Sequence, residues 1–358
     1  MVSVIIVNFH SAYLTKRAVE SVFSDNENIE VFVVDNTAAP DERQTLQSIL
    51  PQGTNLIFNE RNEGFAKACN KAYSMSKGEW IFLLNPDAYL LPIALRKLKR
   101  FLIDNPKAGA VGPRIYWDDE KNFLLPPSIF PSPLGELCGQ IGELSKKFGS
   151  FYSLFWRWHS IKVWQSSRPK KQNALSGGHV MLRRSAIEKS GGLFDEKFFM
   201  FYEDSDLMYR LRKNNYALYI LPEAEVVHCY HHTINKIELM MKSRDLYFKK
   251  NFKNDLLLKI ADIFSKIKKK ERFGSFIHLG KSKTPIQLDT PNSLNENWLF
   301  EWSPSSSFIP SVGYFGKGPK MEFSNEVRVL LGPGIYYGRF SNLNQFFPSF
   351  ITLSWEVE

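Results

Sequence analysis

Apolar runs and helically spaced segments alternate through residues 1–115, and this alternation restricts the possible fold more strongly than any other feature. The runs that suit buried strands are Val2–Asn8, Ile29–Val34, Asn55–Phe58 and Glu79–Leu84. The segments with helical spacing are Ala12–Ser24, Pro40–Leu50 and Glu63–Ser76. Short apolar strands separated by helices are typical of a parallel sheet covered on both faces. The sequence therefore predicts an α/β fold with a mostly parallel sheet flanked by helices.

The rest of the chain divides at changes in composition. We expect the α/β domain to span residues 1–250, a basic amphipathic helical linker to span 251–272, and a small all-β module to span 273–358. The module contains eight of the 21 glycines and seven of the 19 prolines. Its β-type runs are Trp298–Trp302, Val327–Leu331, Ile335–Phe340 and Phe350–Val357. Within the first domain, residues 118–172 show no clear period and are expected to be irregular.

The net charge of +9 is concentrated, because residues 242–272 carry eleven Lys or Arg against four Asp or Glu. Such a cluster favours an anionic partner, and a phospholipid surface or a lipid-linked diphosphate suits it better than nucleic acid, for which no motif is present. No apolar run reaches the ~18 residues of a membrane-spanning helix, and no basic segment opens the chain as in a signal peptide. Three scattered cysteines form no disulfide framework. We expect a cytoplasmic protein that can lie peripherally on the inner face of the cytoplasmic membrane.

Polar residues stand at the ends of the predicted strands. Asn8 ends the first strand, Asp35 follows the second, and Asn85-Pro86-Asp87 follows the fourth. Ligands of open parallel sheets bind at the carboxyl ends of the strands, so these residues are expected along one crevice. A carboxylate there can bind a divalent cation that bridges phosphate oxygens, although Asn-Pro-Asp is also ordinary turn chemistry.

A glycine begins the third predicted helix, in the segment Asn62 to Asn70. Gly64 allows the backbone to approach a ligand closely at a helix N-terminus. The same residues are equally typical of an asparagine-capped helix that binds nothing.

Three acidic residues, Glu203, Asp204 and Asp206, open a later helix after five apolar or aromatic residues. Helix capping explains acidic residues at this place. A carboxylate against an aromatic wall can also acquire a raised pKa and act as a general base, and we favour this interpretation. His228 follows an apolar run and could complete a metal site with Asp87. A zinc site formed with Cys229, His231 and His232 is a weaker alternative, because a second pair of ligands is missing.

Taken in order, these motifs resemble glycosyltransferase family 2, an inverting family with the GT-A fold. The resemblance covers about residues 2–250. Its carriers are Val4–Asn8, Val33–Asn36, Asn62–Ala66 with Asn70, Phe82–Ala88, Ser176–Gly178 and Gly192–Asp206. The Asn-Pro-Asp form and the Phe-Phe…Glu-Asp-x-Asp block are most similar to bacterial rhamnosyltransferases and galactofuranosyltransferases.

The resemblance implies a role for each motif. The residues it places at the nucleotide-sugar are Asn8, Asp35, Asn62, Gly64, Asn70, Asn85 and Asp87. The residues it places on the acceptor side are Ser176, Gly177, Gly178 and Asp206. Asp204 matches the catalytic base, with Glu203 as the alternative. Asp87 and His228 would hold Mg²⁺ or Mn²⁺, while Asn85 stands where the family has its first acidic residue.

The implied function is inverting transfer of a sugar, rhamnose favoured, to a hydroxyl of a cell-surface polysaccharide or lipid-linked acceptor. The donor would be dTDP-rhamnose, with a UDP-sugar as the alternative. A different class of function is a non-catalytic carbohydrate-binding relative of the same fold. In that case aromatic residues of the β-rich module would serve as platforms for sugar rings, although such residues more often form a core. The residues concerned are Trp298, Trp302, Tyr336, Tyr337 and Trp355.

Overall fold

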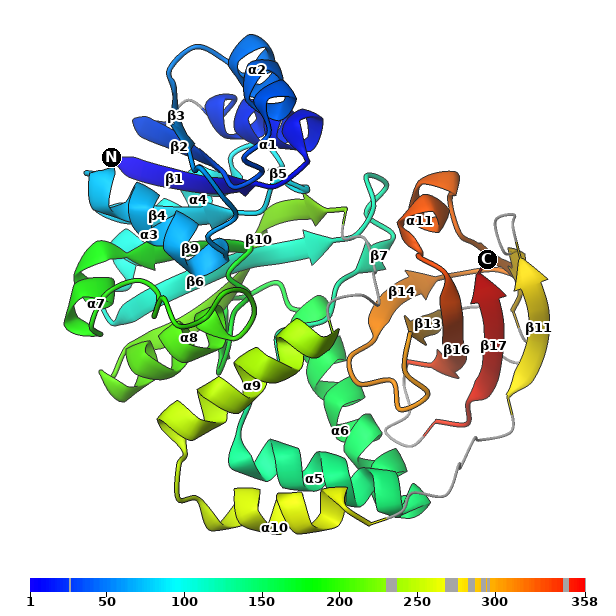
Figure 1. Ribbon diagram of the computed structural model, residues 1–358. Coiled ribbons are helices and arrows are strands. Elements are labelled where there is room, and N and C mark those ends of the chain that lie inside the picture. Colours follow the sequence, from blue (N-terminus) through cyan, green and yellow to red (C-terminus); the bar gives the residue numbers. More distant parts are fainter. Residues whose placement is uncertain are drawn as a thin grey trace.

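The computed structural model describes residues 1–25, 27–229, 237–267, 276–282, 287–290, 294, 297–343 and 348–357 (Figure 1). The strands of its first part are β1 (Val2–Asn8), β2 (Ile29–Asp35), β3 (Thr54–Phe58), β4 (Trp80–Leu84), β5 (Ala88–Leu90), β6 (Ala108–Tyr116), β7 (Phe123–Leu124), β8 (Lys170–Gln172), β9 (His179–Arg183) and β10 (Ala217–His228). The helices of that part are α1 (Ala12–Phe23), α2 (Pro40–Ile49), α3 (Phe65–Met75), α4 (Ala94–Asp104), α5 (Pro133–Leu144), α6 (Lys146–Trp164), α7 (Arg184–Lys189), α8 (Glu203–Lys213), α9 (Ile237–Asn251) and α10 (Leu256–Ser265).

The central sheet begins with four parallel strands in the order β3–β2–β1–β4. Strand β9 then pairs antiparallel with both β4 and β6, and β10 runs parallel to β6. The end of β10 pairs antiparallel with β5, and the register places His228 opposite Ala88. The α/β prediction of a mostly parallel sheet flanked by helices is confirmed.

Side chains alternate between the two faces of the sheet, as they must along a strand. Ile5 and Val7 of β1 belong to a core shared with α3, α7, α8 and α9. Val4 and Ile6 belong to a second core shared with α1 and α4. Because both faces are covered, the central strands β1 and β4 are almost entirely apolar, and the polar residues Asn8 and Asn85 stand where these strands end.

Residues 118–172 were expected to be irregular, but they contain the helical hairpin α5–α6. Its glycines and prolines lower helix propensity, which explains the wrong prediction. Pro133 nevertheless lies in the first turn, and Ser132 caps the helix through its hydroxyl. Gly149 lies so close to α5 that an added Cβ would be 2.6 Å from Gly142 O. The glycines therefore serve close helix–helix packing. The helix predicted for the linker 251–272 is present as α10, which ends at Ser265, and residues 268–272 lie outside the described part.

The C-terminal elements are β11 (Ile277–Ser282), β12 (Gln287–Asp289), β13 (Trp298–Ser303), β14 (Val312–Gly316), β15 (Lys320–Glu322), α11 (Asn325–Leu330), β16 (Gly334–Asn342) and β17 (Ile351–Val357). The strand order β11–β17–β16–β13–β14 continues through β7 into β6, so the short β7 joins these strands to the central sheet. The β-type prediction for Val327–Leu331 was wrong, because Ser324 caps a short helix there. Trp298, Trp302, Tyr336 and Trp355 form the core of this part and are not sugar platforms.

Within the described ranges, the model contains no helix with the length and apolarity needed to cross a membrane.

Candidate active site

A buried network joins the carboxyl ends of β1 and β2. Asn8 Nδ2 donates to Asp35 Oδ1 and to Glu42 Oε1, each at 2.9 Å, and Asn8 Oδ1 accepts from Thr15 Oγ1 at 2.8 Å. Both the amide nitrogen and the amide oxygen of Asn8 therefore have hydrogen-bond partners within the protein. Asp35 is fully buried, yet its Oδ2 has no hydrogen-bond partner. Leaving a buried carboxylate oxygen unpaired is costly, so Oδ2 is a natural acceptor for a ligand's donor group.

The N-terminus of α3 adjoins this network. Asn36 Nδ2 donates to Gly64 O at 3.1 Å, and Asn62 Oδ1 accepts from Gly64 N at 3.0 Å. Gly64 has a φ of +85°, and an added Cβ would lie 2.4 Å from Phe199 O. That carbonyl also accepts from Phe65 N at 2.7 Å. Glycine is required here because the segment before α8 lies directly on the helix start.

Asn70 lies in the second turn of α3 and contacts the loop at Phe194. Its Nδ2 donates to Phe194 O at 2.9 Å, and its Oδ1 accepts from Phe194 N at 3.1 Å. Asn70 therefore holds the loop that leads toward α8, and a direct contact with a nucleotide-sugar stays a prediction.

The turn after β4 packs against the glycines before β9. Asn85 N donates to Gly178 O at 2.7 Å, and a Cβ on Gly178 would lie 2.6 Å from Asn85 Nδ2. Ser176 Oγ accepts from Gly178 N at 3.2 Å. Gly177 N donates to Asp204 Oδ2 at 3.0 Å. The Ser-Gly-Gly segment thus bridges the turn that carries Asp87 and the start of α8.

Asp87 and His228 meet at this turn, as predicted for a metal pair. Asp87 Oδ1 lies 3.2 Å from His228 Nε2, and the Asp87 side chain is about one quarter exposed (26%). The ring of His179 packs edge-on against His228 with centroids 5.3 Å apart. Burial lowers the pKa of His179 to about 3, with a further contribution from the neighbouring His228, so His179 is neutral at physiological pH. His231 and His232 lie outside the described residues.

Glu203 and Asp204 begin α8 after two residues with left-handed backbone, Phe201 and Tyr202 (φ 69° and 64°). Glu203 is buried, and its Oε2 has no hydrogen-bond partner. Burial, together with the charge of Asp204, raises the pKa of Glu203 to about 8. Asp204 keeps part of its surface accessible. Burial raises its pKa too, and hydrogen bonds from Gly177 and Ser205 oppose the rise. Both carboxyls thus have a raised pKa, and Glu203, the more deeply buried of the two, keeps its proton at neutral pH.

Asp206 lies below this pair and is completely buried. Its Oδ2 accepts from Arg210 Nε at 2.8 Å and from Lys250 Nζ at 2.9 Å, and its Oδ1 accepts from Asn251 Nδ2 at 3.0 Å. Arg210 in turn donates to the backbone oxygens of Ser190, Gly192 and Leu193. Asp206 thus anchors α8 to α9 and to the preceding loop, and any influence on an acceptor passes through this anchoring.

Most of the predicted residues therefore lie together at the carboxyl edge of the sheet. Asn70 and Asp206 do not lie at this edge but hold the surrounding elements in place. Sequence reasoning missed Glu42 and His179. Glu42 accepts hydrogen bonds from Asn8 and from the backbone N of Ser11 and Ala12, so its carboxylate caps the N-terminus of α1. His179 follows the Ser-Gly-Gly motif directly, and this position, opposite Leu84 in the β4–β9 register, was the available signal.

The residues at Asp87 fit a divalent cation. Two adjacent ligands of an octahedral ion, each at ~2.1 Å, are ~3 Å apart, close to the separation of Asp87 Oδ1 and His228 Nε2. An imidazole nitrogen suits Mg²⁺ less well than an all-oxygen set, so Mn²⁺ fits the pair better. No group of three or more His, Cys, Asp or Glu able to hold a metal occurs in the ranges given above. The pair would thus leave most coordination positions to phosphate oxygens and water.

The parallel sheet and the acidic groups at its carboxyl edge define an α/β protein with a candidate ligand site at that edge. Residues 3–191, slightly more than half of the chain, match the family described as glycosyl transferase family 2. The chain therefore belongs to that family and is a glycosyltransferase. The match ends before α8, so it does not include Asp204 or His228.

Curated relatives agree with this family. An N-acetylglucosaminyl-diphospho-decaprenol L-rhamnosyltransferase of Mycobacterium tuberculosis is 29% identical over 220 residues, which is 60% of this chain and 67% of that protein. The dTDP-rhamnosyl transferase RfbF of Shigella flexneri is 27% identical over 205 residues, 56% of this chain and 60% of its own length. The hexosyltransferase Agl10 of Haloferax volcanii is 26% identical over 218 residues, 60% of this chain and 62% of its own. The chain thus spans less than two thirds of the last two relatives.

Solved structures show weaker likenesses. Residues 1–349 of TarS from S. aureus give a TM-score of 0.47 at 15% identity, covering 74% of this chain and 68% of that one. The mannosyltransferase PcManGT from Pyrobaculum calidifontis gives 0.44 at 15% identity, covering 74% and 73%. Scores below 0.5 carry no weight in the assignment.

Proposed function

We propose that the protein transfers a sugar, with inversion, from a nucleoside diphosphate sugar to a hydroxyl of a glycan or lipid-linked acceptor. Rhamnose from dTDP-rhamnose is the favoured donor sugar, because two of the relatives are described as rhamnosyltransferases, and a UDP-sugar is the alternative. The observation that carries the proposal is the position of Asp204. Its carboxylate is held by Gly177 on the same edge that carries the Asp87–His228 pair.

Donor recognition is assigned to the ends of β1, β2 and α3. The unpaired Asp35 Oδ2 would accept from the base or ribose of the nucleotide. Gly64 is packed against Phe199 O and would hold the start of α3 beside the diphosphate, where backbone N–H groups favour negative charge. Asn8 and Asn62 hold these two groups in place. A divalent cation on Asp87 and His228 would supply positive charge for the leaving diphosphate.

The base is assigned to Asp204 rather than Glu203. Glu203 is buried and, with a pKa of about 8, holds its proton at pH 7, so it cannot accept another. Asp204 remains partly accessible, and its raised pKa makes it a stronger base than an ordinary aspartate. The acceptor oxygen attacks the anomeric carbon and passes its proton to Asp204. The bond from that carbon to the diphosphate breaks on the opposite face, which inverts the configuration.

We further propose that the enzyme works in the cytoplasm, peripherally on an anionic membrane. Helix α6 exposes three aromatic side chains at helical spacing: Phe151 (57%), Phe155 (51%) and Trp158 (41%). The Lys162 ammonium lies 3.3 Å from the Trp158 ring centroid. An aromatic stripe beside lysines is typical of helices that lie in a membrane interface. Flotation with anionic vesicles would test this proposal, and the absence of salt-sensitive binding would contradict it.

The main experiment measures nucleoside diphosphate release from dTDP-rhamnose, UDP-galactofuranose and other activated sugars, with and without Mn²⁺ or Mg²⁺. Asp204→Asn should lower turnover by ~10²–10⁴-fold, the usual contribution of a general base, while donor binding by calorimetry is retained. Glu203→Gln is the matched control, because glutamine mimics a protonated glutamate, and it should stay near wild-type activity. The reverse pattern would assign the base to Glu203. If the wild type released no nucleoside diphosphate from any donor of the panel and bound no nucleotide, the proposed function would be refuted.

A further inference from the structure

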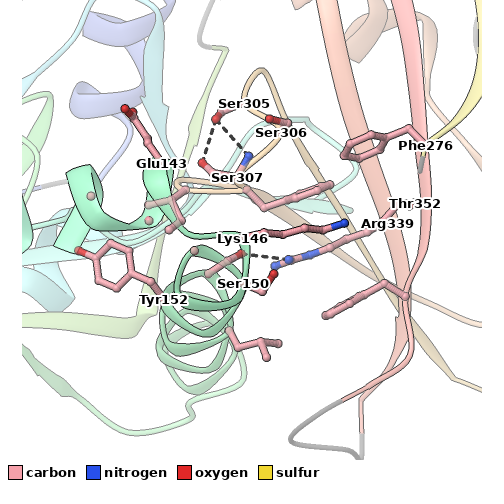
Figure 2. A pocket seen from close by; sticks show the side chains of 18 residues that line it. Glu143, Lys146, Ser150, Tyr152, Phe276, Ser305, Ser306, Ser307, Arg339 and Thr352 are labelled. Atoms are coloured by element: carbon pink, nitrogen blue, oxygen red, sulfur yellow. Dashed lines mark hydrogen bonds between the residues drawn. The ribbon is translucent and has the colours of Figure 1, made fainter. Parts of the chain in front are cut away.

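A cavity of about 700 Å³ lies between the α5–α6 hairpin and the C-terminal sheet. Its walls come from α5, from the first half of α6, from residues 305–309 and from β16 and β17. None of the candidate active-site residues lines it. Figure 2 shows the side chain of Lys146 pointing from α6 toward the strands that carry Arg339 and Thr352. The cavity is therefore a second concave site, large enough for a small organic molecule.

A buried group of charges next to the cavity carries a net positive charge. Arg157 and Arg339 are each 4% exposed, and both donate to Glu301, which is fully buried. Their remaining bonds go to neutral hydroxyls, from Arg157 to Ser341 and from Arg339 to Ser153. In the described part of the chain, neither arginine has a second acidic partner. Two guanidinium groups thus share one carboxylate, and burial lowers the pKa of Arg157, with Arg339 adding to the effect.

An excess buried charge is unfavourable unless an anion approaches it, and the cavity offers the place. Arg339 lines the cavity wall together with Lys146. Lys146 is exposed and forms no ion pair with the residues that the structure describes. Three consecutive serines, 305 to 307, add hydroxyl donors from a separate loop. Glu143, at the exposed rim, is the one acidic residue among the lining residues.

Aromatic side chains form another part of the lining. Phe276, Phe308 and Phe350 all face the cavity. The Arg339 guanidinium lies 4.3 Å from the Phe308 ring centroid and 4.7 Å from that of Phe350. Cationic groups and hydroxyls thus adjoin a wall of phenyl rings. Such a wall suits a ligand with a charged end and an apolar body.

We propose that this cavity binds an amphiphile with a phosphate head and an apolar body. Lys146, Arg339 and the serines 305–307 would bind the phosphate, and the phenylalanines would pack against the apolar body. Phosphate fits because its several oxygens can accept from donors on different elements at once. This site goes beyond the proposed sugar transfer and does not depend on it, since binding is measured without a donor sugar.

Gly139 supplies a clean way to fill the cavity. It lines the wall from α5, and nothing lies within 4 Å of the position where its Cβ would be. A tryptophan there enters open space, whereas Gly149 has no such room because of Gly142. Gly139→Ala leaves the cavity open and serves as the matched control for any effect on helix α5.

The test is calorimetric titration of the whole protein with octyl phosphate, octanol and inorganic phosphate. We expect octyl phosphate to bind more tightly than either of the others. Gly139→Trp should abolish that binding and Gly139→Ala should retain it. Lys146→Gln, at an exposed position that leaves the fold intact, should weaken it by ~10-fold or more, as for loss of a charged hydrogen bond.

Three results would overturn the proposal. Equal binding of octanol would remove the role of the anion, and equal binding of inorganic phosphate would remove the role of the apolar wall. Octyl phosphate binding that is absent in the wild type, or unchanged in both Gly139→Trp and Lys146→Gln, would place no such ligand in this cavity.

Discussion

Glu203→Gln should change how the stability of this protein depends on pH. The Glu203 carboxyl is buried at the start of α8, has an unpaired Oε2 and lies beside Asp204. Its pKa is raised from 4.5 to about 8, chiefly by burial and secondly by the charge of Asp204. The native state therefore keeps a proton on Glu203 at pH values where the unfolded chain has already released it.

The sign follows from this difference in bound protons. Between the unfolded pKa of 4.5 and the folded pKa of about 8, the native state binds one more proton than the unfolded state. The stability from this group is fully present below pH 4.5 and is lost as the pH rises through 8. Each pH unit in the window removes at most ~1.4 kcal/mol, so the loss between pH 5 and pH 8 is roughly 2–4 kcal/mol. Glutamine has no proton to release, so the variant should not show this loss.

Urea unfolding of the wild type and Glu203→Gln at pH 5, 6.5 and 8 measures the effect. The free energy of unfolding of the variant, relative to the wild type, should increase by roughly 2–4 kcal/mol from pH 5 to pH 8. Glu188→Gln on the neighbouring α7 is the control, because Glu188 is exposed and should show no such trend. If the wild type and Glu203→Gln had parallel pH profiles, Glu203 would not be the buried, protonated member of the pair, and the argument for Asp204 as base would lose its basis.

Three further outcomes are expected. Asp206→Ala leaves the cations of Arg210 and Lys250 without their buried partner and should cost roughly 3–5 kcal/mol in urea unfolding; an unchanged midpoint would show that the anchor is unimportant. Gly64→Ala forces a Cβ to within 2.4 Å of Phe199 O at a left-handed φ, so both the melting temperature and the nucleotide affinity should fall, and a variant as stable as wild type would contradict the observed packing. Asp87→Ala should weaken binding of a nucleoside diphosphate by ~10–100-fold when Mn²⁺ is present and little when it is absent; equal loss in both conditions would argue against a cation on Asp87.

The sequence predicted the sheet well because its strands are buried on both faces. Continuous apolar runs such as Val2–Asn8 leave few alternatives, and the polar residues that end them mark one edge. The hairpin α5–α6 could not be predicted from local propensity, because its glycines are explained by contacts between two helices. Val327–Leu331 was misassigned for a related reason, since a segment of five residues with four apolar side chains fits a strand or a short helix equally well.

The candidate site was predictable in its chemistry and less so in its geometry. Asp87 and His228 are 141 residues apart, and only the β5–β10 register brings them together. His179 gave no signal apart from its place after a glycine pair. In the sequence only the family resemblance distinguishes the three acidic residues of α8, whereas the structure gives them three different environments.

Those environments follow from the geometry of one helix start. Successive residues of a helix point in directions about 100° apart, which turns Asp204 away from Glu203, whereas Asp206 lies nearly one turn further along the same side of the helix as Glu203. Glu203 points into the core and remains protonated, Asp204 meets Gly177 N at the open edge, and Asp206 meets the cations below. The left-handed backbone of Phe201 and Tyr202 is unfavourable for such residues and persists only where surrounding contacts impose it. The Asp206 anchor and the bond from Phe65 N to Phe199 O are contacts of that kind. We therefore propose that Asp206 supports catalysis indirectly, by holding the start of α8 and with it Asp204 in position.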